Sequence, residues 1–90
     1  MKDLPNTVRA YSRSPDFNAQ TVPAGLTRDH NTKSGVWGVI NVIEGTIEYV
    51  IPSLCERHSL SSAKCGIVEP EVPHHVVLAP DAKFYVEFYR

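Results

Sequence analysis

The segment Val68–Leu78, with the sequence VEPEVPHHVVL, places two prolines and a histidine pair ahead of an apolar run. Proline fixes its own φ and has no backbone N–H, so Pro70 and Pro73 exclude a helix and a central ladder position at this corner. The histidine pair therefore begins an outgoing strand, and its two side chains point to opposite faces. If His74 points inward, it stands at the mouth of an apolar interior, where an imidazole is a candidate metal ligand or acid–base group. The alternative interpretation is a histidine that only satisfies a carbonyl of the turn.

The rest of the chain is divided into short extended segments. Seven prolines and five glycines interrupt it, and no window shows the apolar period of a capped helix. Val36–Ile43 is largely apolar on both faces, as expected of a central strand, and Glu44-Gly45 separates it from the alternating run Thr46–Ile51. A two-residue X-Gly loop between such runs predicts a β-hairpin. Lys83–Arg90 predicts a final strand.

The weaker segments complete the prediction of an all-β fold. We expect a first edge strand in Thr7–Ser12, a turn, or a single helical turn, at Ser14–Phe17, and a short strand in Leu26–His30. Pro52–Cys65 is polar and serine-rich and predicts a long loop, with a brief pairing at Ser59-Leu60. About seven or eight short antiparallel strands, with turns at short intervals and no long helix, predict a sandwich or closed barrel of the jelly-roll type.

Length and composition limit the classes of protein that the chain can be. Ninety residues, 42% hydrophobic and 21% charged, predict one globular domain over residues 1–90 with a thin core. A net charge of -1 without any basic run argues against a nucleic-acid partner and an anionic membrane surface. The absence of a signal-like or membrane-spanning stretch predicts a cytoplasmic protein, with Cys55 and Cys65 as reduced thiols. The exposed first strand, the thin core and the aromatic last strand predict a homodimer.

Several segments together resemble the cupin family. Val68–His74 is similar to the second cupin motif, which often ends in Gly-Val-Pro-His, and Asn41–Ile47 is similar to the glycine turn that ends the first motif. The order of motifs along nearly the whole chain resembles a small single-domain cupin family labelled tellurite-resistance-related or TehB-like. These motifs are Val22–Leu26, His30, Thr32-Lys33, Gly35–Trp37, Ile43–Gly45, Glu69-Pro70, Val72–His74 and Phe84–Phe88. A similar domain precedes a methyltransferase in some tellurite-resistance proteins.

The resemblance implies a cupin-type jelly-roll barrel, and it implies no particular chemistry because fold does not fix function. The sequence also departs from the cupin metal set. Of the two histidines and the glutamate of the first motif, only His30 is present: Thr32 stands at the second histidine and Trp37 near the glutamate. In the second motif, Glu69 replaces the leading proline and Glu71 replaces the glycine.

We nevertheless expect a divalent metal at the barrel mouth, because an open catalytic site needs only about three protein ligands. The expected ligands are His30, His74 and Glu87, with His75 and Lys33 as further candidates. Imidazole and carboxylate ligands favour zinc or iron over magnesium or calcium. The alternative for Glu87 is a surface carboxylate on the outward face of the last strand. A shifted register of the second motif would place His75, rather than His74, at the motif histidine.

Three classes of function follow from these observations. The first, which we prefer, is a small cupin-like domain that binds a divalent metal and a small molecule or oxyanion at the barrel mouth. The alternative is a metal-free binding or dimerisation module that acts on a partner enzyme such as a methyltransferase, and a third is a dimerisation domain with a vestigial cleft. The chain shows no Ser/His/Asp or Cys/His constellation, no Gly-rich phosphate loop and no nucleotide-binding βαβ unit. Methyl transfer would therefore have to come from a partner.

Overall fold

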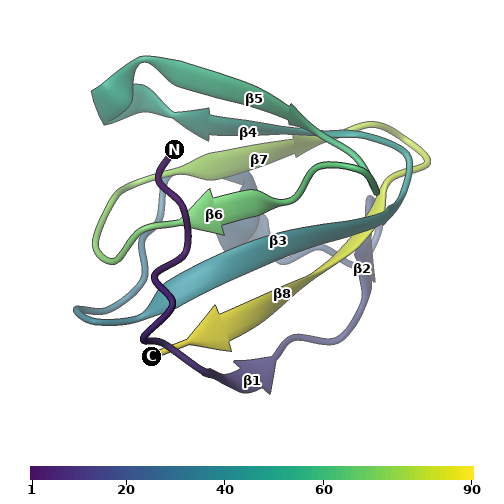
Figure 1. The fold of residues 1–90 in the computed structure, drawn as a ribbon. Coiled ribbons are helices and arrows are strands. Elements are labelled where there is room, and N and C mark those ends of the chain that lie inside the picture. The colour runs from purple at the N-terminus through teal and green to yellow at the C-terminus, as the bar shows by residue number, and fades with distance from the viewer.

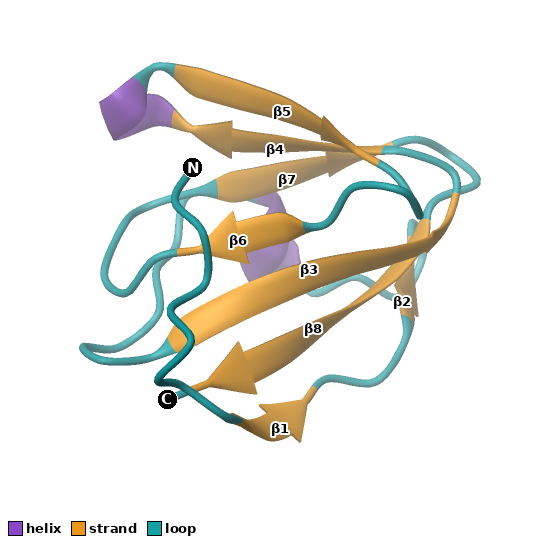
Figure 2. Cartoon of the chain, in the orientation of Figure 1, coloured by secondary structure: helices purple, strands orange, loops and turns teal.

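Eight short strands form two facing antiparallel sheets in the structure, a computed structural model that describes residues 1–90 (Figure 1). The only helical elements are two short 3-10 turns, η1 and η2 (Figure 2). The elements follow one another as β1 (Ala10–Arg13), β2 (Phe17–Asn18), η1 (Ala24–Thr27), β3 (Trp37–Glu44), β4 (Ile47–Ile51), η2 (Pro52–Leu54), β5 (Glu56–Leu60), β6 (Gly66–Val68), β7 (His75–Leu78) and β8 (Lys83–Tyr89). Neither helical element has the length and hydropathy needed to cross a bilayer.

The two sheets differ in size and do not share a strand. The larger sheet has the order β1-β8-β3-β6, with β2 also paired to β8, and the smaller sheet has the order β5-β4-β7. The prediction of short antiparallel strands without a long helix is therefore confirmed. The closed barrel that the sequence predicted is not formed, because no strand of one sheet pairs with a strand of the other.

The turn at Gly45 carries the chain from one sheet to the other, and the predicted hairpin is wrong. β3 pairs with β6 and β8, whereas β4 pairs with β5 and β7. Gly45 has a φ of 68°, and a Cβ added there would lie 2.8 Å from Asp81 Oδ1 and 2.9 Å from Ala82 Cα. The turn thus packs directly on the connection between β7 and β8. The chain crosses to the second sheet at this corner instead of returning along the first.

Two other segments differ from the sequence prediction. The polar segment Pro52–Cys65, expected to be a loop, contains β5, which pairs along its whole length with β4. The two strands are connected by the η2 turn and by Cys55, whose φ is 53°. The predicted strand Leu26–His30 is replaced by η1 and by a single bridge between His30 and His74. Ser14–Phe17 forms no helical turn and leads from β1 into β2. Both free thiols, Cys55 and Cys65, are exposed, one on either side of β5.

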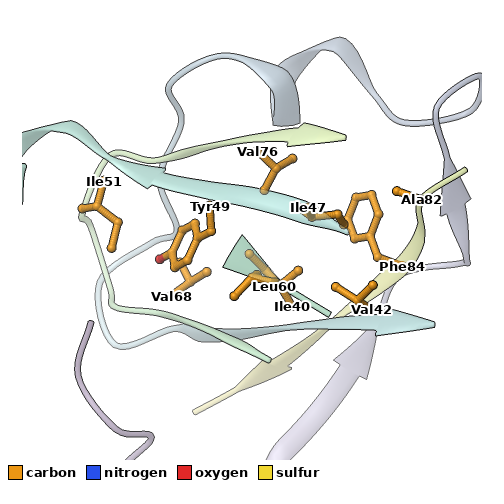
Figure 3. Packing of buried hydrophobic residues seen from close by; sticks show 10 residues of the cluster. All are labelled: Ile40, Val42, Ile47, Tyr49, Ile51, Leu60, Val68, Val76, Ala82 and Phe84. Carbon is orange, nitrogen blue, oxygen red and sulfur yellow. The ribbon is translucent and has the colours of Figure 1, made fainter. Parts of the chain in front are cut away.

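A hydrophobic core fills the space between the sheets (Figure 3). Its ten buried residues come from both sheets and from the β7–β8 connection: Ile40, Val42, Ile47, Tyr49, Ile51, Leu60, Val68, Val76, Ala82 and Phe84. Tyr49 is buried together with its hydroxyl, which donates a hydrogen bond of 2.9 Å to the carbonyl of Ile67. Because burying one such side chain stabilises a fold by about 1.5–3 kcal/mol, this cluster supplies the main stabilising contribution of a small domain.

Candidate functional site

A cleft of about 610 Å³ lies beside the core, on the inner face of the larger sheet. It is lined by β1, β2, β3, β6 and β8 of the larger sheet, and by η1 and β7. Half of its 20 lining residues are hydrophobic, among them Phe17, Leu26, Ile40, Val76, Phe84 and Phe88. The volume is that of a typical small-molecule site, since such sites measure about 300–1,000 Å³.

Two histidines from distant parts of the chain meet at this cleft. His30 and His74 exchange backbone hydrogen bonds of 3.0 and 2.9 Å, as directly opposed residues of an antiparallel pair do. The backbone N–H of Glu71 donates to the carbonyl of Thr32 at 3.1 Å and extends this short pairing. The two imidazole rings consequently lie against each other in a tilted arrangement, with centroids 4.2 Å apart and planes inclined by 54°.

Both imidazoles are held in the same way by their own backbone. Nδ1 of His30 lies 3.1 Å from the carbonyl oxygen of Arg28, and Nδ1 of His74 lies 3.0 Å from that of Val72. A carbonyl oxygen can only accept, so Nδ1 carries the proton in each ring. In the neutral rings Nε2 is then a bare acceptor, and neither Nε2 has a partner within the protein.

His74 is the more deeply buried histidine of the pair. The residue is 3% exposed, and its ring contacts those of His30 and Tyr49, the latter nearly perpendicular with a centroid 5.5 Å away. Burial lowers the pKa of His74, and the hydrogen bond to Val72 opposes this effect only in part. His74 is therefore neutral at neutral pH, in the form that accepts a hydrogen bond or coordinates a metal.

The cleft is lined without a single acidic side chain. Its one lysine or arginine is Lys33, which lies in the loop before β3, is exposed to solvent and forms no ion pair. The nearest carboxylate in sequence to the histidine pair, Asp29, is occupied elsewhere, because its Oδ1 lies 2.7 Å from Nδ1 of His75. The polar side of the cleft therefore carries the imidazole pair and an available cation.

Three of the five residues predicted for the site line the cleft, namely His30, His74 and Lys33. Glu87 does not, because it alternates with the inward Val86 and Phe88 and accepts a hydrogen bond of 3.1 Å from Asn41 Nδ2 on the outer face. His75 is outside the cleft as well, at Asp29. No group of three or more His, Cys, Asp or Glu residues is placed to hold a metal ion.

Sequence reasoning missed the wall opposite the histidines. Tyr11, Ser12 and Phe17 line the cleft from β1 and β2, and η1 contributes Leu26. Tyr11 and Ser12 had been placed in the predicted first edge strand, Phe17 in the predicted turn and Leu26 in a strand that does not form, but none of them had been assigned to the site. Asp29 was missed as well. In the fold Asp29 contacts His75 and His30 pairs with His74, but no local sequence pattern indicates this pairing.

A two-sheet, all-β domain with a histidine-lined cleft is the class of protein that this fold and site define. Within that class, the chain belongs to the TehB-like domain family, which it matches over residues 12–86. It is 26% identical over 92 residues to the probable S-adenosyl-L-methionine-dependent methyltransferase TehB of Haemophilus influenzae, covering 96% of this chain and 32% of TehB. It is 24% identical over 101 residues to YeaR, an uncharacterized protein of Escherichia coli K12, covering 99% of this chain and 83% of YeaR.

Two crystal structures have the same fold. A protein from E. coli K12 superposes with a TM-score of 0.86 at 23% identity, covering 100% of this chain and 97% of the other. TehB from H. influenzae superposes with a TM-score of 0.82 at 24% identity, covering 93% of this chain and 32% of TehB. At these identities the likeness shows the fold alone. The chain spans about a third of the length of TehB.

Proposed function

We propose that this domain is a small-molecule-binding module and that its cleft is the binding site. The observation that carries the proposal is the histidine pair: two imidazoles side by side at an apolar cleft, each fixed through Nδ1 and each with an unused Nε2. Preoriented acceptors beside an apolar wall are typical of small-molecule sites, in which a few placed polar groups set the orientation of the ligand. The ligand lays its apolar part against β3 and β8, and Nε2 of His30 or His74 accepts from any donor group that the ligand carries beside that part.

A partner enzyme is the natural user of such a module. The same domain aligns with about a third of TehB, named as a probable methyltransferase, and with most of the much shorter YeaR. A function that serves both settings belongs to the domain itself and does not require methyl transfer. We therefore assign binding to this chain, and the chemistry to a partner such as a methyltransferase. The resemblance to cupins supports the same location, because the motif-like segment Val68–His74 contributes its first and last residues to the cleft.

A divalent metal, expected from the sequence, fits this site less well than an organic ligand does. His30 and His74 would supply two imidazole ligands, and their Nδ1–H···O=C bonds are the kind that orients metal-binding histidines. An open catalytic zinc site uses about three protein ligands, and no third His, Cys, Asp or Glu lines the cleft. The proposed binding function accordingly involves no metal.

The proposal is tested with the neutral dye phenylnaphthylamine, which fluoresces in apolar surroundings and carries one N–H donor. We expect the dye to bind the wild-type protein and to shift the NMR signals of the His30 and His74 rings, while the ring of His58, outside the cleft, stays unchanged. Val36→Trp fills the cleft and should abolish binding. Val77→Trp, on the exposed face of β7, is the matched control and should bind normally. Equal binding by both variants would place the dye elsewhere and refute the proposal.

A further inference from the structure

The charges around the cleft select one class of ligand. Ten of its 20 lining residues are hydrophobic and none is acidic, while Lys33 is the only lysine or arginine. Two other basic side chains, which lie outside the cleft, are paired with carboxylates: Arg57 with Glu48 and Arg13 with Asp16. Lys33 has no carboxylate within ion-pair distance. An unpaired cation at the rim of an apolar cleft without acidic groups attracts an anion and repels a cation.

The two ends of the cleft differ in chemistry: one end carries Lys33 and the other carries aromatic rings. The register of the larger sheet pairs Gly38 with Phe88 at one end and Val42 with Phe84 at the other. Four residues along a strand correspond to about 13 Å. Lys33 precedes β3 and so lies at the Gly38–Phe88 end, whereas Phe84 and Phe17, with ring centroids 5.7 Å apart, close the other end. A ligand along β8 therefore has its charged group near solvent and its apolar part against aromatic rings.

We infer that the cleft takes an organic monoanion, with an apolar body along β3 and β8 and a single carboxylate or similar group at Lys33. This inference rests on the proposed binding function and specifies its ligand class. A bare inorganic oxyanion is disfavoured, because burying it against apolar walls removes water without replacing its hydrogen bonds. Burial keeps His74 neutral, so that its Nε2 is an acceptor and provides no donor to such an ion. At the exposed Lys33, in contrast, the anionic group of the ligand stays in contact with water, while the apolar body is buried in the cleft.

The test compares octanoate with octanol, which share the apolar chain and differ in charge, by isothermal titration calorimetry on the whole protein. We expect octanoate to bind more tightly than octanol. Lys33→Gln should weaken octanoate binding about fivefold, the effect of losing one exposed ion pair, and leave octanol binding unchanged. Lys33→Arg keeps the charge and should bind octanoate within about twofold of wild type. Lys64→Gln removes a lysine that does not line the cleft and is the matched control.

Chain length tests the apolar half of the inference. From butanoate to octanoate, each added methylene group should tighten binding by about fourfold, the value that corresponds to burying one CH₂. Equal affinity for octanoate and octanol, unchanged in Lys33→Gln, overturns the inference while keeping the proposed function. Inorganic phosphate that competes with octanoate at equal concentration overturns the apolar half. If neither octanoate nor octanol binds, and phenylnaphthylamine does not bind either, the proposed function itself fails.

Discussion

Replacing Gly45 by alanine should destabilise the fold much more than the same replacement at Gly35. Both glycines have a positive φ, 68° at Gly45 and 77° at Gly35, so both replacements force an L-residue into the left-handed region. That conformation costs about 1 kcal/mol for a residue with a Cβ. The two sites differ in their surroundings. A Cβ at Gly35 has no heavy atom within 4 Å, whereas a Cβ at Gly45 meets Asp81 and Ala82 at 3.0 Å or less.

The contact at Gly45 cannot be relieved by moving a flexible side chain alone. The backbone atoms of Ala82 lie 2.9 and 3.0 Å from the added Cβ, and Ala82 is 1% exposed within the core cluster. Inserting a methyl group into such a packed position costs about 1–3 kcal/mol. We therefore expect the free energy of unfolding to fall by about 1 kcal/mol in Gly35→Ala and by about 2–4 kcal/mol in Gly45→Ala.

Urea denaturation, followed by the fluorescence of the single tryptophan, measures both losses under the same conditions. The slope of the free energy against urea concentration should be the same in both variants, so that midpoints compare stability directly. Equal losses in the two variants would show that the corner at Gly45 does not pack on the β7–β8 connection. The account of how the chain crosses between the sheets would then be wrong.

Further measurements bear on the histidine pair and on assembly. Because burial lowers the pKa of His74 in the folded state, the unfolded chain binds more protons than the folded protein below a pH of about 6.5. The free energy of unfolding should therefore fall as the pH falls from about 6.5 toward the lower pKa of folded His74, by up to about 1.4 kcal/mol per pH unit. His74→Phe should remove this dependence. Parallel curves of unfolding free energy against pH for the two proteins would refute the prediction. Elemental analysis of protein purified without a metal-affinity tag should find far less than one equivalent of zinc or iron, and a full equivalent that disappears in His74→Ala would restore the metal site. Light scattering should give twice the mass of one chain, since β1 is exposed throughout at the edge of its sheet, and a monomer mass at all micromolar concentrations would contradict the predicted homodimer.

Strands could be predicted from the sequence where the strand's own residues carry an apolar pattern. β3 and β8 are long and apolar, and their positions follow from local pattern. β5 was missed because its charged and polar residues resemble a loop, and Leu60, its one fully buried residue, acquires that role only through pairing with β4. The hairpin at Gly45 was wrong for a related reason. A turn residue determines that the chain turns, but not whether the next strand finds its partner in the same sheet.

The same distinction separates the two halves of the site. His74 was expected at the barrel mouth from the Pro73 corner and the motif register, whereas alternation left open which of the two histidines points inward. The structure places the side chains of His74 and Val76 at the cleft. The partner His30 lies in a segment without periodic pattern, and only the fold brings it opposite His74. Alternation also placed Glu87 on the outward face as the second interpretation of that residue, and its bond to Asn41 lies there. A ligand set assembled from separate segments cannot be read from spacing.

Core and cleft share one space between the sheets, and this links binding to stability. Along β8, Phe84 is 1% exposed in the core cluster, while Val86 and Phe88, farther along the same inner face, remain partly exposed in the cleft. A small domain that leaves apolar side chains accessible on its inner face forgoes part of the stability that burying them would give. An apolar ligand restores that burial, and because it binds only the folded chain, it stabilises the fold by an amount that grows with its concentration relative to Kd. The ligand thus completes the core, and Lys33 and the histidine pair at the cleft determine which molecule does so.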